Sequence, residues 1–386
     1  MLHRVAIENY RSIRKLILPL GSLNVITGAN GSGKSSLYRA LRLLAQTASG
    51  GVVGALAEEG GLQSALWAGP ENISRRMQQG EVPVQGAVRK EAVRLRLGFI
   101  DDEFGYSISF GLPVPSHTLF SLDPEIKHEA IWVGETPRPS ALLVERRGAV
   151  LRVRRDEKLS IVTDSGDLFE SLFSQLLDPS SAPEVGALRR RLRGWRFYDN
   201  LRTDREAPAR MPQVGTRTAA LHHDGRDLAA AWQTIREIGD GGRLDELVAG
   251  ALAQSVVQIS SQDDGRLMVQ LQQPGILRAL RAHELSEGTL RFLMLAAALL
   301  TPRPPSMMVL NEPEVSLHPE LIPPLAQLIG EASEKMQIWV VTHNQALVSL
   351  LSKVEGSRQI LLRKELGQTL AEVPDYDEST PWRWVE

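Results

Sequence analysis

The fold is decided by one stretch near the N-terminus, Gly28-Ala29-Asn30-Gly31-Ser32-Gly33-Lys34-Ser35. This stretch matches the pattern G-x-x-x-x-G-K-[ST] at every fixed position. Its glycines let backbone N–H groups curve around phosphate oxygens, and the helix that begins near Lys34 points its positive end at the same anion. We therefore expect Lys34 to reach the β- and γ-phosphates of a nucleotide, and the Ser35 hydroxyl to ligate Mg²⁺. The other nucleotide contacts are predicted from Asn30, Gly31, Ser32, Gly33 and Ser36.

The residues on either side of this loop support the same interpretation. Leu23 to Thr27 is an apolar run that predicts a short buried strand. Ser36 to Gln46 carries leucines at the spacing of an amphipathic helix. The alternative is a glycine-rich turn with a chance lysine, and the order strand, loop, helix argues against it. The sequence therefore predicts a nucleotide-binding loop.

Two polar strand ends in the C-terminal third extend the predicted site. The apolar run Met307 to Leu310 leads into Asn311-Glu312-Pro313-Glu314, and Val340 to Thr342 leads into His343. Parallel strands bring their carboxyl ends to one edge of a sheet, where ligands bind. Glu312 is expected to orient and deprotonate the attacking water, and His343 to contact the γ-phosphate.

A third motif begins the helix expected over 286–300. Ser286 is a good N-cap residue, and Glu287 and Gly288 lie in the first helical turn. A helix start with a hydroxyl and a glycine can bind a second anion. We therefore include Ser286, Glu287 and Gly288 among the predicted nucleotide contacts.

Short strands alternate with helices in this part of the chain, which is typical of an α/β fold with a largely parallel sheet. Its further elements are predicted at 320–334, 338–342 and 344–351. The middle predicts strands at 93–99, 104–110 and 150–155, followed by helices at 166–177, 184–193, 226–238 and 243–257. One sheet is therefore expected to be assembled from both chain ends, around an insertion.

Composition indicates an ordinary folded protein. The 386 residues are 42% apolar, and the formal net charge of −2 means that any nucleic-acid site must be a local patch. The chain has no cysteine, which excludes disulfides and thiolate metal sites and fits a reducing cytosol. No apolar run approaches the ~20 residues of a membrane span, and the N-terminus lacks a signal-peptide core. We expect a cytoplasmic protein without a membrane partner.

The order of these motifs resembles the ABC-type ATPases. The form Glu-Pro-Glu-x-x-Leu-His-Pro at 312–319 and the N-terminal Ile-Glu-Asn-Tyr-Arg-Ser-Ile at 7–13 resemble the RecF, SMC and OLD branch, in particular compact RecF-like bacterial AAA-type ATPases. The resemblance implies a P-loop NTPase of ABC-head type with an antiparallel β subdomain and a helical insertion. The expected division is 1–160 and 276–386 for the two parts of the head, with the insertion at 161–275.

The resemblance also implies how the parts work together. Two heads would sandwich two ATP molecules, so that Ser286 and Gly288 act in trans on the partner's γ-phosphate in a homodimer. Gln63 would be the Q-loop glutamine, a ligand of Mg²⁺ and a contact to the nucleotide. Asn311 stands where the family strand usually has an acid, and its amide can still join the Mg²⁺ shell with weaker attraction.

The implied activity is ATP hydrolysis in DNA repair, genome maintenance or defence against phage and plasmids. DNA and a separate effector or nuclease chain are the candidate partners. The main alternative is an ATP-gated scaffold that holds a toxin or nuclease with little hydrolysis. A transporter ATPase subunit is disfavoured by the Glu-Pro-Glu form, and an ATPase fused to its own nuclease by the short chain after His343.

Three lesser features have two interpretations each. The basic run 189–196 can contact nucleic acid, with Trp195 stacking on a base, or form a solvated helix face. The arginines Arg146, Arg147, Arg152, Arg154 and Arg155 can form a second cluster or protect an edge strand. The resemblance places Tyr10 or Arg11 beside the adenine, whereas Tyr10 can equally be core.

The run His222-His223-Asp224 suggests a metal site at first sight. Adjacent side chains are expected to point apart, and further ligands at suitable spacing are lacking in the sequence. We therefore interpret this run as a loop before a helix with Asp227 near its start.

Overall fold

The computed structural model describes residues 1–70, 75–79, 81, 93–114, 117, 119–156, 158–178, 180, 182–199, 201–374 and 382–385. The chain forms two compact units. The first contains residues 1–21, 27–195 and 359–386, and the second contains residues 22–26 and 196–358. The chain passes between the units within strands β3 (Leu23–Gly28) and β17 (Ser357–Glu365), so both units draw on distant parts of the sequence.

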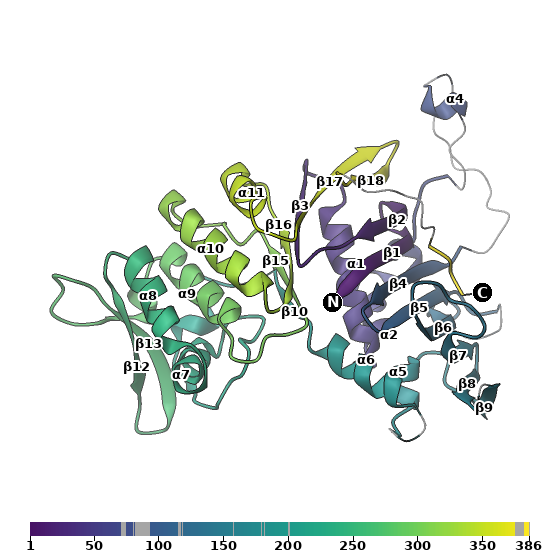
Figure 1. Ribbon diagram of the computed structural model, residues 1–386, viewed down its shortest axis with the longest axis horizontal. Coiled ribbons are helices and arrows are strands. Elements are labelled where there is room, and N and C mark those ends of the chain that lie inside the picture. The colour runs from purple at the N-terminus through teal and green to yellow at the C-terminus, as the bar shows by residue number, and fades with distance from the viewer. Residues whose placement is uncertain are drawn as a thin grey trace. The chain divides into compact units, whose positions relative to one another are not determined.

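The first unit is built on an eight-stranded antiparallel sheet (Figure 1). Its strand order is β2-β1-β4-β5-β6-β7-β8-β9. The bounds are β1 Leu2–Tyr10, β2 Ile13–Pro19, β4 Leu95–Asp101, β5 Phe104–Gly111, β6 Glu125–Val133, β7 Leu142–Arg147, β8 Val150–Arg155 and β9 Lys158–Thr163. The predicted strand pair at 93–99 and 104–110 is confirmed as β4 and β5. Their turn is closed by Asp101, whose carboxylate accepts from the backbone N–H groups of Glu103 and Phe104.

Helices and a C-terminal hairpin complete this unit. The helices are α1 Lys34–Thr47, α2 Val52–Glu58, α3 Gly61–Ala65, α4 Arg75–Gln78, α5 Leu172–Gln175 and α6 Pro183–Arg193. The hairpin pairs β17 with β18 (Gln368–Glu372). In α1 the leucines at 37, 41 and 44 are buried, as the helical spacing predicts.

The predicted helix at 166–177 is wrong except for α5. The carbonyl groups of Asp167 and Glu170 accept hydrogen bonds from the buried Arg146 guanidinium and from the side-chain amide of Gln175. A helix would direct these carbonyls at backbone N–H groups four residues later. Ser171 then caps α5 through its bond from Phe173 N.

The second unit contains a parallel sheet covered by helices (Figure 1). Its strands lie in the order β10 (Arg196–Tyr198), β15 (Met307–Asn311), β16 (Gln337–Val341) and β3, with all three pairs parallel. The helices are α7 Leu228–Ile238, α8 Gly241–Ala251, α9 Glu287–Leu299, α10 Ile322–Ser333 and α11 Gln345–Leu351, with short 3-10 turns at 208–210, 282–284 and 319–321. The predicted α/β alternation of the C-terminal third is confirmed.

A small antiparallel sheet lies in the same unit. It has β13 (Arg266–Gln272) between β12 (Val256–Ser261) and β11 (Gln213–Val214), and β14 (Leu280–Arg281) also pairs with β13. The prediction of one helix over 243–257 is therefore wrong beyond Ala251. Ala253 and Gln254 adopt positive φ angles of 48° and 59°, which ends the helix before the β-branched strand residues begin.

The second unit buries a large continuous core. Leu23 and Val25 of β3 belong to it together with most of α9 and half of α10. In the described part of the chain no helix is long and apolar enough to cross a membrane. The three-part division at residues 160 and 275 remains a prediction.

Candidate functional site

The phosphate loop leads from β3 directly into α1, as predicted. Gly33 precedes the helix in a left-handed conformation with φ 108°. A Cβ on Gly33 would lie 2.0 Å from Thr369 Oγ1, and one on Gly28 would lie 2.4 Å from the Leu362 carbonyl oxygen. These two positions therefore require glycine both for their backbone angles and for the close approach of the C-terminal hairpin.

Lys34 is the first residue of α1, and its side chain reaches back to the start of the phosphate loop. Its Nζ donates to the carbonyl oxygens of Gly28 at 2.7 Å and Ala29 at 2.9 Å, and only 8% of the residue is exposed. The ammonium group is thus held inside the curve of the loop, where a phosphate can replace the two carbonyls as its partner. Ser35 follows in the first turn of α1 and is exposed.

Tyr10, the last residue of β1, and Arg11 are both bound by an acid for which the sequence predicted no role. Tyr10 is fully buried, and its hydroxyl donates to the Glu59 carboxylate at 2.7 Å. Arg11 Nη2 donates to the same carboxylate at 2.8 Å. Burial and the bond to Glu59 raise the pKa of Tyr10 above its usual value, so the phenol keeps its proton and donates. The Tyr10 ring therefore belongs to the core, as the second of its two interpretations has it, and Arg11 remains the predicted neighbour of an adenine.

Glu312 follows β15 in a strained conformation. Its φ is 47°, which is unusual for a residue with a side chain and is typical of functional sites. Glu312 N donates to the Val341 carbonyl at 2.7 Å, and the Glu312 carbonyl accepts from Arg291 Nη2 at 2.9 Å. The backbone is held from both sides, while the side chain remains 41% exposed.

His343 follows the neighbouring strand and faces Glu312. His343 Nε2 lies 3.5 Å from Glu312 Oε1. Glu314 supports this arrangement, because its Oε1 accepts from the Thr342 hydroxyl at 2.5 Å and from His343 N at 3.3 Å. Among the described residues, Glu314 Oε2 is buried without a hydrogen-bond partner. Glu314 has no role in the prediction from the sequence, although the second acid of Glu-Pro-Glu is a visible signal.

The start of α9 has the predicted cap. Ser286 Oγ accepts from Thr289 N at 3.1 Å. Ser286 and Glu287 are both exposed. Position 288 requires a glycine, because a Cβ there would lie 2.4 Å from the Ser316 carbonyl oxygen. The helix start can therefore pack directly against the segment that follows Glu-Pro-Glu.

The predicted magnesium ligands are all oxygen donors of the kind that Mg²⁺ prefers. Asn311 is the last residue of β15 and is half-buried, beside Val341 in register. Gln63 is exposed on the short helix α3, and Ser35 is exposed on α1. The hydroxyl and amide groups of this donor set fit a magnesium ion, whereas nitrogen and sulfur ligands would not.

The predicted site residues are divided between the two units of the chain. Lys34, Ser35, Ser36 and Gln63 belong to the first unit. The second unit holds Ser286, Glu287, Gly288, Asn311, Glu312 and His343, of which Glu312 and His343 are neighbours.

In the basic run 189–196, Trp195 and Arg191 both make contacts within the fold. Trp195 is buried at 4% exposure, with its ring 5.9 Å from that of Phe99. The Arg191 guanidinium forms ion pairs with Asp101 and Glu103. The prediction that Trp195 stacks on a base is therefore wrong, since its ring belongs to the core.

Arginines of the second cluster, at 146–155, also form contacts within the fold. Arg146 is completely buried, and it lies 3.9 Å from the buried carboxylate of Glu129. Arg147 and Arg152 both pair with Glu145. These contacts favour a structural role for this hairpin over a nucleic-acid surface. The interpretation as a protected edge strand is wrong, because β7 and β8 lie inside the sheet and β9 forms its edge.

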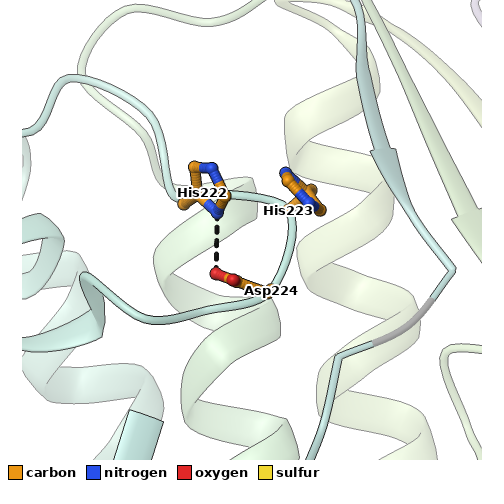
Figure 2. Close-up of side chains that lie close together, drawn as sticks. All are labelled: His222, His223 and Asp224. Atoms are coloured by element: carbon orange, nitrogen blue, oxygen red, sulfur yellow. Dashed lines mark hydrogen bonds and ion pairs between the residues drawn. The ribbon is translucent and has the colours of Figure 1, made fainter. Parts of the chain in front are cut away.

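The residues 222–224 form a closed turn before α7. His222 Nδ1 lies 2.7 Å from Asp224 Oδ1. Figure 2 shows this bond, with the His223 ring alongside. The two rings lie 4.0 Å apart, so the expectation that they point apart is wrong. All three residues offer ligand atoms within 4.8 Å of one another.

A guanidinium nevertheless already holds the carboxylate of this turn. Arg226 donates to Asp224 Oδ2 through Nε at 2.8 Å and Nη2 at 2.5 Å, and its Nε also lies 3.0 Å from Oδ1. Partial burial would raise the pKa of Asp224, but the bonds from Arg226 and His222 outweigh it and lower that pKa well below its usual range. Asp227 accepts from His222 N at 2.9 Å. A metal ion would meet the Arg226 cation, so the contacts support the predicted loop before a helix, with Asp227 at the start of α7.

Two solved SMC head structures have a fold similar to that of this chain. The SmcHead bound to the C-winged helix domain of ScpA matches with a TM-score of 0.53 at 14% identity, over 97% of this chain and 98% of that one. The SMC head domain from Thermotoga maritima gives a TM-score of 0.50 at 14% identity, over 97% of this chain and 99% of that one. No curated protein matches the chain.

The fold is that of a P-loop NTPase, in the form of an SMC- and RecF-like ABC-type ATPase head, and this confirms the predicted fold class. The chain belongs to the family described as "AAA domain, putative AbiEii toxin, Type IV TA system", which matches residues 23–349.

Proposed function

We propose that this protein binds Mg-ATP and hydrolyses its terminal phosphoanhydride bond. The observation that carries the proposal is the Glu312–His343 pair, together with the phosphate loop around Lys34. β15, β16 and β3 are parallel neighbours, and Glu312, His343 and the phosphate loop each follow the carboxyl end of one of these strands. That edge of a parallel sheet is where nucleotides bind in related folds.

The chemistry assigns a role to each group. Lys34 exchanges its two carbonyl partners for phosphate oxygens and neutralises charge on the β- and γ-phosphates. Glu312 accepts a proton from the water that attacks the γ-phosphorus, and His343 donates to a γ-phosphate oxygen. Ser35, Gln63 and Asn311 would hold Mg²⁺, and the bound ion would neutralise charge on the phosphates.

We further propose that the active form is a homodimer. The start of α9 exposes Ser286 and Glu287, and a helix N-terminus there can bind the γ-phosphate held by a second copy. ATP would then close the dimer, and hydrolysis would reopen it, because the γ-phosphate is the ligand that both copies share. Family membership and the SMC-like fold support this proposal.

The cellular role proposed is DNA repair, genome maintenance or antiviral defence, with DNA or a separate effector chain as partner. The family description, which names a toxin–antitoxin system, supports the defence setting. The SmcHead structure contains a bound winged-helix domain of another protein, and a comparable effector contact is proposed here.

An ATP-gated scaffold remains the second candidate, and Asn311 is the observation that favours it. A neutral amide at this position attracts Mg²⁺ less strongly than a carboxylate and would slow hydrolysis more than binding. The two candidates are separated by phosphate release from purified protein under saturating Mg-ATP. Steady turnover that is lost in Glu312→Gln supports the hydrolase, whereas tight ATP binding without turnover supports the scaffold.

A further inference from the structure

A buried hydroxyl network in the first unit reaches from the C-terminal hairpin to the phosphate loop. Thr369 of β18 is fully buried, and its Oγ1 donates to the Ser32 carbonyl oxygen at 2.9 Å. Ser12 Oγ lies 2.8 Å from Thr369 Oγ1 and 3.3 Å from Ser36 Oγ. The Thr369 backbone N–H donates to the Ser12 carbonyl at 2.7 Å. One side chain therefore joins the β1–β2 turn, the phosphate loop and the hairpin.

The number of protons that each group can donate determines the direction of these hydrogen bonds. A hydroxyl has one proton to donate, and the Thr369 proton goes to the Ser32 carbonyl, which can only accept. Ser12 must then donate to Thr369 Oγ1, and Ser36 can donate to Ser12. The network has a single acceptor at its end, and that acceptor is a backbone atom of the phosphate loop.

The Ser32 carbonyl belongs to the same peptide unit as the Gly33 N–H. In a planar trans peptide these two groups point in opposite directions. Because Thr369 holds the carbonyl toward the hairpin, the Gly33 N–H points away from the hairpin. Backbone N–H groups are the anion ligands of such loops, so their direction determines how well phosphate is bound.

Packing reinforces this restraint. A Cβ placed on Gly33 would meet Thr369 Oγ1 at 2.0 Å and Thr369 Cγ2 at 2.8 Å, so the threonine lies directly against the glycine. The loop peptide therefore has little room to rotate while Thr369 is present.

We propose that Thr369 is a positioning residue for nucleotide binding, which makes the C-terminal hairpin a part of the phosphate site. This inference rests on the proposed function, namely that the loop binds ATP. The Thr369 hydroxyl orients the Ser32–Gly33 peptide before ATP binds. The free-energy cost of ordering the loop therefore does not reduce the affinity for ATP.

The test compares two matched variants in the full chain. Thr369→Val keeps the shape and removes the hydroxyl, whereas Thr369→Ser keeps the hydroxyl. Kd for Mg-ATP is measured by titration calorimetry, and KM and kcat by phosphate release. We expect Thr369→Val to raise Kd and KM roughly tenfold with kcat within about twofold, and Thr369→Ser to change Kd less than about threefold.

The outcomes separate this inference from the proposed function. A structural defect alone would lower the active fraction and the unfolding temperature but would leave Kd of the folded molecules unchanged. Equal Kd values for wild type and Thr369→Val overturn the positioning role and leave ATP binding standing. A wild-type protein that binds no Mg-ATP at millimolar concentration overturns both. If Thr369→Val does not fold, Thr369→Cys replaces it, because a thiol is a weak donor in the same place.

Discussion

The Glu312 carboxylate and the His343 imidazole lie 3.5 Å apart at the ends of neighbouring parallel strands. Glu312 is anchored through its backbone by Val341 and Arg291, and the His343 backbone is bound by Glu314. Both functional side chains remain partly exposed, at 41% and 38%. The pair is thus held by its backbone and is open at its side-chain atoms, as the proposed roles of general base and phosphate contact require.

Removal of the loop ammonium should abolish nucleotide affinity. Lys34→Ala leaves the Gly28 and Ala29 carbonyls without their partner and the phosphates without a buried cation. We expect Kd for ATP to rise by at least about 100-fold in titration calorimetry, which corresponds to the loss of about 3 kcal/mol. The exposed lysine variant Lys353→Ala is the control and should bind like wild type. An unchanged Kd in Lys34→Ala would refute the assignment of the phosphate loop.

Glu314 should influence turnover through His343. Glu314→Ala removes the acceptor for Thr342 Oγ1 and His343 N. The His343 ring then loses its fixed position, so we expect kcat to fall about tenfold with little change in KM. Glu320→Ala, whose side chain is 88% exposed, is the matched control. Equal kcat values for the two variants would mean that Glu314 does not position His343.

A large side chain at the start of α9 should prevent dimer closure. Ser286 is exposed there, and Ser286→Arg adds bulk without touching the phosphate loop. We expect ATP affinity to remain and the ATP-dependent increase in mass to disappear, as measured by light scattering. Ser352→Arg, on the exposed end of α11, should still dimerise. Normal ATP-dependent dimerisation of Ser286→Arg would exclude the role in trans.

Arg291 should matter for the stability of the protein. The Arg291 guanidinium is largely buried and donates to the carbonyls of Glu312, Pro313 and Leu201. Arg291→Met leaves these acceptors unpaired, so we expect a loss of about 2–4 kcal/mol in the free energy of unfolding, measured by denaturant titration. A stability within about 0.5 kcal/mol of wild type would show that water replaces the arginine.

Motifs with fixed spacing could be predicted from the sequence, whereas tertiary contacts could not. The strand, loop and helix around Lys34 and the strands before Glu312 and His343 follow from local pattern, and the structure contains all of them. Thr369 carries no local signal, because its partner Ser32 is 337 positions away. The arginines around Trp195 suggest an exposed position, but tertiary packing buries its ring against Phe99.

The same limit explains the wrong helices. At 166–177, the buried Arg146 takes the carbonyls that a helix would use. At 252–257, positive φ angles at Ala253 and Gln254 turn the chain into a strand whose partner is β13. Both outcomes depend on residues outside the local window, which periodicity does not contain.

The most direct test of the ATP-driven dimer is the light-scattering mass of the purified protein with Mg-ATP, wild type beside Glu312→Gln, with phosphate release recorded on the same samples. We predict that ATP brings wild type to a transient dimer with steady turnover. In Glu312→Gln the dimer persists and turnover falls at least about 100-fold, because the general base is lost while the phosphate loop is intact. Rapid turnover by Glu312→Gln, or a mass that ATP leaves unchanged in both proteins, would contradict the account.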